Sequence, residues 1–254
     1  MNQIFNFPRF IKLLSFNFNI HKKRYLLLLG GVFAALFLFQ LVILLSNPRW
    51  NNMDWSGLFI GTGIVGAIFY FGKSFPYLRK KETTIDALMI PASVFEKYLM
   101  EIVSRFVVYL LVFPVIFYLA SHLSAIFATI LSEDISYSGF MFASLFDKVP
   151  KEAFTILVWV FAFGASIVFA GAASIRKYPL IKTIVLVGAI FMLMVGYFYI
   201  IIEVIDLKQG LEYMTRSLHG SKESALMSLK LFLGCSTLIT LVYAFFKLKE
   251  REIA

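Results

Sequence analysis

Long apolar runs separated by short polar stretches dominate the pattern along the chain. Six of these runs can cross a hydrocarbon layer of about 30 Å, which takes about 20 helical residues. They lack the alternation of membrane-barrel strands, and in lipid each segment must satisfy its own backbone hydrogen bonds, so helices are expected. The predicted spans are Tyr25 to Leu45, Leu58 to Tyr77, Phe106 to Leu131, Ala153 to Ala173, Ile181 to Ile202 and Leu229 to Phe246.

Composition agrees with this pattern. The chain of 254 residues is 60% hydrophobic and 15% charged, whereas a typical soluble domain is about 25% charged. Its 29 Phe residues would leave large apolar patches in water. We therefore expect an all-α polytopic membrane protein in which residues 1–254 form one transmembrane domain, without a soluble catalytic module.

Basic residues set the expected orientation. Lys and Arg number 17 on the side that carries both termini and 7 on the other side. The positive-inside rule places the richer side in the cytoplasm, so both termini are expected there. The net charge of +9 thus follows from membrane topology, and nucleic acid is not an expected partner. The first run lacks a small-residue cleavage pattern, so it is expected to be retained.

Two nucleotide-binding patterns occur in and after the second run. Gly61-Thr-Gly63-Ile-Val-Gly66 fits the dinucleotide pattern G-x-G-x-x-G, and Gly72-Lys73-Ser74 imitates the end of a phosphate-binding loop. Both are rejected, because the glycine trio lies inside a membrane-length run with no preceding soluble strand, and the phosphate-loop match has Ala67 where its first glycine should be. Small residues four apart predict instead helix faces that allow close packing. These pairs are Gly63 with Ala67, Thr62 with Gly66, and Ala170 with Ser174.

The sequence contains no recognisable catalytic or metal-binding constellation. His21, His122 and His219 lie in different segments, and the single Cys235 can form no internal disulfide. We therefore expect no catalytic residue, cofactor or metal site in this chain. Ionisable residues in or near apolar runs can line a transport pathway, although ordinary interfacial or packing roles compete with that interpretation. The pathway candidates are Lys73, His122 and Glu203.

A charged stretch between the second and third runs has an ordered pattern: Leu78-Arg-Lys-Lys-Glu-Thr-Thr-Ile-Asp-Ala-Leu-Met-Ile-Pro-Ala-Ser-Val-Phe-Glu-Lys97. Within it, Ile85, Leu88 and Met89 share one helical face. Pro91 interrupts the helix, and the capping box of Ser93 and Glu96 starts another helix that leads into the third span. Region 78–105 is therefore predicted as helix, break and helix.

This region has two interpretations. It can lie at the headgroups, with its basic flank Arg79-Lys80-Lys81 on anionic lipid. Alternatively, its first helix docks a cytoplasmic protein. The docking candidates are Glu82, Thr83, Thr84, Ile85, Asp86, Leu88 and Met89, and the hinge and cap candidates are Pro91, Ser93 and Glu96.

The same stretch resembles the passage L-x-x-K-E…L-P-A-S…E-K of type 2 ABC-exporter permeases, short bacterial membrane subunits that work with a separate ATPase. Ile90 stands where that passage usually has Leu. The resemblance implies six spans, an interfacial N-terminal helix in 1–24, a coupling helix after the second span and an external segment in 203–228. Phe10, Ile11, Leu14 and Phe18 can form the apolar stripe of the interfacial helix. Seven charges in 203–228 argue against deep re-entry of that segment into the membrane.

The resemblance also implies ATP-driven export from the bacterial cytoplasmic (inner) membrane. This chain would supply the substrate path among membrane lipids, while ATP and Mg bind a partner, the cytoplasmic ABC ATPase. Two copies of the chain, or one copy with a related permease, would pair with two ATPase subunits. Two rival hypotheses stay open: a self-contained membrane-embedded enzyme, such as a lipid-modifying transferase or protease, and an assembly or scaffold protein.

Overall fold

The computed structural model describes residues 5–47, 49–79, 89–132, 137–143, 145, 151–199 and 222–253. Every regular element in this part of the chain is helical. Six helical stretches are long and apolar enough to cross a membrane, which confirms the all-α polytopic fold expected from the sequence. They are Phe7–Ser46, Asp54–Phe71, Val94–Leu131, Phe154–Ser174, Pro179–Tyr197 and Leu226–Arg251.

The chain divides into two compact units. Unit 1 joins Met1–Tyr70 with Leu88–Lys151, and unit 2 joins Phe71–Ala87 with Glu152–Ala254. The elements of unit 1 are α1 (Phe7–Ser46), α2 (Asn52–Phe71), α4 (Val94–Ile102), the π turn η2 (Val103–Val107) and α5 (Val108–Leu131). Those of unit 2 are the 3₁₀ turn η1 (Pro76–Leu78), α7 (Lys151–Ser174), α8 (Pro179–Tyr199) and α10 (Lys222–Ile253).

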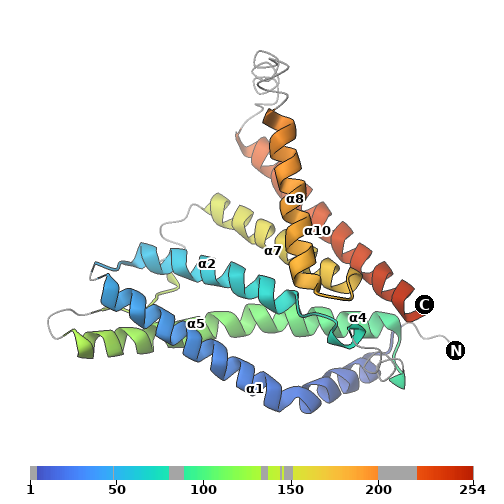
Figure 1. The fold of residues 1–254 in the computed structure, drawn as a ribbon, viewed down its shortest axis with the longest axis horizontal. Helices are drawn as coiled ribbons and strands as arrows, with labels where there is room; N and C mark the ends of the chain where they lie inside the picture. The colour runs from blue at the N-terminus through green and yellow to red at the C-terminus, as the bar shows by residue number, and fades with distance from the viewer. Residues whose placement is uncertain are drawn as a thin grey trace. The chain divides into compact units, whose positions relative to one another are not determined.

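Helix α1 combines the predicted interfacial helix and the predicted first span. The Asn6 side chain caps its start by accepting a hydrogen bond from the Arg9 N–H at 3.2 Å. The helix has 40 residues, so a straight version would be about 60 Å long, twice the thickness of the hydrocarbon layer. Figure 1 shows that α1 changes direction along its length. The transition predicted at Tyr25 is therefore not a break in the helix.

Helix α2 ends earlier than the sequence indicated. Its last residue is Phe71, and a turn follows, so the predicted end of the second span at Tyr77 is wrong. Phe75 adopts a left-handed conformation with φ of 52° before Pro76 starts η1. A non-glycine residue in that conformation marks a specific turn. The apolar residues Phe75 to Tyr77 lengthened the hydrophobic run without extending the helix.

Helices α4 and α5 form one continuous helical segment through η2. The Ser93 side chain accepts from the Glu96 N–H at 3.2 Å, and the Glu96 carboxylate accepts from the Ser93 N–H at 2.9 Å. This geometry confirms the predicted capping box and the helix leading into the third span. The π turn adds one residue to the winding, which is a local departure common at functional positions.

Small residues let the helices of unit 2 approach closely. A Cβ built on Gly171 of α7 would collide with the Thr183 side chain of α8, and one on Gly234 of α10 would lie 3.4 Å from the Trp159 ring. Ala170 is buried beside Gly171, and the Ser174 hydroxyl donates back to its carbonyl at 2.8 Å. The small-residue face predicted at Ala170 therefore lies in the packed interior of this unit.

The predicted small-residue face of α2 packs against aromatic side chains of α5. A Cβ on Gly63 would lie 3.1 Å from the Phe113 ring, and one on Gly66 would lie 2.9 Å from the Tyr109 hydroxyl. That hydroxyl donates to the Gly63 carbonyl at 2.5 Å. The rings of Phe113 and Tyr109 thus occupy the space that larger side chains at Gly63 and Gly66 would fill. This confirms that these glycines allow close helix packing, as predicted in preference to dinucleotide binding.

Replacing Gly63 by Val is expected to destabilise the protein by about 1–3 kcal/mol, because the new methyl groups would displace the Phe113 ring in a packed interface. Gly61→Val is the matched control, since nothing lies within 4 Å of a Cβ at Gly61. The measurement is the thermal unfolding midpoint in mild detergent, followed by tryptophan fluorescence. Equal midpoints for the two variants would contradict this packing account.

Candidate functional site

The carboxylate of Glu96 joins the start of α1 to the start of α4. It accepts from the Asn6 N–H at 2.8 Å, from Arg9 Nε at 2.8 and 3.0 Å, and from Arg9 Nη2 at 2.8 Å. It also accepts the capping hydrogen bond of Ser93. The Glu96 side chain is 0% exposed and that of Arg9 is 38% exposed. We call this arrangement of Asn6, Arg9, Ser93 and Glu96 the clasp.

An apolar cluster lies beside the clasp. Phe10 and Leu13 of α1 are buried with Met100 of α4, and Ile90 and Ala92 pack against them. The Ala92 N–H donates to the Ile90 carbonyl at 2.7 Å, which closes a tight turn around Pro91. The chain break predicted at Pro91 is therefore present, and its flanking residues are packed onto α1.

The pKa of Glu96 shows the balance of forces in the clasp, which lies outside the predicted spans. Burial by itself raises the pKa of this carboxyl. The hydrogen bonds from Arg9 and from the N–H groups of Ser93 and Asn6 outweigh burial, so the pKa is lowered from its ordinary value. Folding thus favours the ionised form of Glu96.

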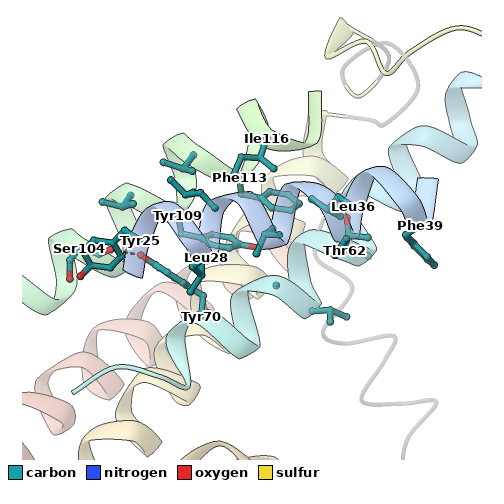
Figure 2. A pocket seen from close by; sticks show the side chains of 18 of the residues that line it. Tyr25, Leu28, Leu36, Phe39, Thr62, Tyr70, Ser104, Tyr109, Phe113 and Ile116 are labelled. Carbon is teal, nitrogen blue, oxygen red and sulfur yellow. Dashed lines mark hydrogen bonds between the residues drawn. The ribbon is translucent and has the colours of Figure 1, made fainter. Parts of the chain in front are cut away.

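A cavity of about 1040 Å³ lies in unit 1 between α1 and α2, with α5 as a third wall. Figure 2 shows the side chains that line it, including Leu28, Leu36 and Phe39 of α1, and Phe113 and Ile116 of α5. Gly57, Gly61 and Val65 line it from α2. We call this cavity the α1–α2 groove. Several of its lining side chains are partly exposed, so the groove is open at the surface.

Polar groups in the walls of the groove bond mainly to the protein itself. The Thr62 hydroxyl donates to the Leu58 carbonyl at 2.7 Å, and the Tyr70 hydroxyl donates to the Ser104 carbonyl at 2.9 Å. The Tyr109 hydroxyl of α5 donates to the Gly63 carbonyl of α2, as described above. These walls therefore suit an apolar occupant better than a polar one.

Arg105 anchors the π turn at one end of the groove. Its Nε lies 3.3 Å from Glu101 Oε2, and its guanidinium carbon lies 4.9 Å from the centre of the Tyr70 ring. Its Nη1 donates to the Tyr70 carbonyl at 3.4 Å. The two contacts with Tyr70 connect the end of α2 to η2, and the contact with Glu101 fixes the Arg105 side chain to α4.

A buried polar cluster also lies between α1 and α5. Gln40, Ser121 and Ser124 are all 0% exposed. Ser124 donates to the Ser121 carbonyl at 3.0 Å and lies 3.5 Å from Gln40 Oε1, while Gln40 Nε2 has no hydrogen-bond partner among the described residues. Ser121 donates to the Tyr118 carbonyl at 2.8 Å and accepts from the Phe140 N–H at 3.3 Å. Sequence reasoning missed Gln40, although a Gln inside an apolar run is a visible signal.

The pathway candidates are not brought together in the described part of the chain. His122 of α5 is half-buried, with Nδ1 3.0 Å from the Tyr118 carbonyl and its ring against Tyr118. Ser121 Oγ lies 3.5 Å from this Nδ1, but the Ser121 hydroxyl donates to the Tyr118 carbonyl at the shorter distance of 2.8 Å, so its proton is not directed at the imidazole. Lys73 is exposed in the turn after α2. Glu203 lies outside the described residues.

The docking candidates lie almost wholly outside the described residues. Glu82, Thr83, Thr84, Ile85, Asp86 and Leu88 belong to this group, and Met89 is described and is 77% exposed. The predicted external segment 203–228 is described only from Lys222 onward, where α10 already runs. Helix α10 therefore begins before the predicted start of the last span at Leu229.

Metal-binding groupings of His, Cys, Asp or Glu are absent from the residues that the structure describes. Comparison with models of known protein families, with curated proteins and with solved structures finds no match to this chain.

Acidification is expected to open the clasp. Because folding lowers the pKa of Glu96, the clasp contributes stability above the ordinary Glu pKa of about 4.3 and loses it as pH falls through the lowered value. The measurement is hydrogen exchange at the Asn6 and Ser93 amides, which donate to the Glu96 carboxylate, corrected for intrinsic rates. Glu96→Gln should already exchange fast at neutral pH and show no further acid-induced loss. An equal loss of protection in that variant on acidification would assign the transition to another group.

Replacing Gln40 by Leu is expected to stabilise the protein by about 1–3 kcal/mol, because it removes a buried amide nitrogen that has no partner. Ser124 keeps its bond to Ser121 in this variant. Ser124→Ala is the comparison, since it takes away the Gln40 contact and should lower stability. The readout is the thermal unfolding midpoint in detergent, and a lower midpoint for Gln40→Leu would mean that the amide is paired.

Proposed function

We propose that this chain is the permease subunit of an ABC exporter, with region 78–105 as the coupling region that docks a cytoplasmic ATPase. The clasp is the observation that carries the proposal. Glu96 ties the residues just after the Pro91 break to the first turn of α1 and to the α4–α5 segment. A displacement of the docking helix would therefore reach two candidate spans at once.

Rigid helices make this transmission physically reasonable. The segment from Val94 to Leu131 is helical throughout, and its first turn is fixed by the capping box. Packed elements with two discrete arrangements are the usual means by which a local contact becomes a larger movement. In this proposal, closure of the ATP-bound partner pushes the docking helix, and the clasp distributes the push to α1 and α4.

The α1–α2 groove supports a transport role more than a catalytic one. Its walls are apolar over most of their length, and their hydroxyl groups donate to carbonyl oxygens of the protein. A membrane-embedded enzyme would instead need a nucleophile, base or metal ligands presented to a cavity. The buried Ser121 and its neighbours have their hydrogen bonds directed into the protein, so they favour the structural role.

The docking role is tested by Ile85→Asp and Leu88→Asp in the complex purified from native membranes in mild detergent. Each change puts a charge on the apolar face of the expected docking helix, so the ATPase should be lost from the complex or no longer stimulated. Membrane insertion and yield of the chain should be unchanged.

Ala87→Asp is the matched control, because the sequence spacing would put Ala87 on the opposite face of the expected helix and the change adds the same charge. This variant should keep the ATPase. Normal recovery and stimulation of the ATPase in Ile85→Asp would contradict the docking role. Purification of the folded chain without any ATPase would favour the enzyme or scaffold hypotheses.

A further inference from the structure

We propose that the α1–α2 groove binds an acyl chain of an anionic phospholipid, with the lipid headgroup beside His21 and Arg24. The site is distinct from the docking region and does not depend on the proposed ATPase partner. It follows from three properties of the groove: its length, its shape and the charge at one end.

The apolar part of the groove has the length of one leaflet. From Leu28 to Phe39 all lining residues of α1 are apolar. Eleven helical steps of about 1.5 Å cover roughly 16 Å, close to half of the hydrocarbon thickness of about 30 Å. A lipid tail entering from one side of the membrane would therefore be covered along its length.

Two glycines of α2 keep the groove open. Gly57 and Gly61 both line it, and nothing lies within 4 Å of a Cβ built on either residue. Internal packing therefore does not require glycine at these positions, in contrast to Gly63 and Gly66 on the neighbouring face. The two glycines therefore leave room for the acyl chain of a bound lipid against the α2 backbone.

The end of the groove near Tyr25 is polar and basic. Asn17, Tyr25, Tyr70 and Ser104 line this end. Arg24 lies seven residues after Asn17 and four before Leu28, so it shares the helical face of these two lining residues. Arg24 is exposed and can reach a phosphate at the headgroup level.

His21 lies between Phe18 and Tyr25 on the same stripe and contacts the Tyr25 ring at 6.2 Å between centroids. Its imidazole is the second nitrogen-bearing side chain at this end, after the guanidinium of Arg24. At the far end Asp54 lies in the groove wall, and Arg49 directly precedes the lining residue Trp50 in the sequence. The charge difference between the ends orients an anionic amphiphile with its headgroup at Arg24.

The experiment uses the full chain in phosphatidylcholine vesicles that contain a trace of phosphatidylglycerol with a diazirine in its acyl chain. After illumination, the labelled peptides are mapped. Label should concentrate on residues 28–39 and 57–66, and unlabelled phosphatidylglycerol should compete better than phosphatidylcholine. Equal labelling of the exposed helix α8, or equal competition by both lipids, would overturn the proposal.

Matched variants separate the groove from the general lipid surface. Gly61→Leu fills the groove and should reduce this labelling several-fold, whereas Gly30→Leu should not, because Gly30 lies on the opposite face of α1 and also has free space around it. Arg24→Gln should weaken competition by phosphatidylglycerol about five-fold. Lys23→Gln removes an equal charge from the opposite face and should have no effect.

A second copy of the chain is the competing occupant. Gly61→Cys would report it by forming a disulfide between two copies. The proposal would be overturned if this disulfide formed in high yield and the chain without the cysteine substitution took up no lipid label. Loss of label in Gly61→Leu with a normal unfolding midpoint would support it.

Discussion

A buried carboxylate must be compensated by hydrogen-bond donors, and Glu96 meets this requirement with groups from two distant parts of the chain. Its partners are the cap of its own helix and the first turn of α1, 87 residues away in sequence. The break at Pro91, the direction of α4 and the start of α1 are therefore fixed together. Separate helices in a membrane have little hydrophobic reason to choose one arrangement, so a polar junction of this kind determines which ends meet.

The groove and the α2–α5 interface show how one helix can serve two purposes. Gly63 and Gly66 face Tyr109 and Phe113, where close approach is enforced by aromatic rings. A Cβ built on Gly61, on a neighbouring face, would meet no side chain or neighbouring element within 4 Å. The same small residue type thus tightens one side of α2 and opens the other. What a Cβ would touch thus distinguishes Gly63 and Gly66, which pack against aromatic rings, from Gly61, which lines the groove.

Local patterns were readable from the sequence, and long-range ones were not. The capping box of Ser93 and Glu96 spans three residues, so its spacing alone predicted it. The contact of Glu96 with Arg9 depends on how α1 packs against α4 in three dimensions. No local sequence pattern specifies that packing. The end of α2 was misjudged because Phe75 to Tyr77 continue the apolar run, while the turn depends on the left-handed Phe75. The groove was missed because lipid-facing and cavity-facing residues are equally apolar.

The π turn η2 has a geometric consequence for the segment that contains it. One additional residue in an α-helix corresponds to about 100° of rotation about the axis. The face of α4 that carries Glu96 and the face of α5 that carries Tyr109 are therefore set out of phase with a uniform helix. The residues Val103–Val107 therefore set a fixed rotation between α4, at the start of the segment, and α5, which follows it. Removing one residue there would preserve a continuous helix and yet turn one set of contacts away from its partners.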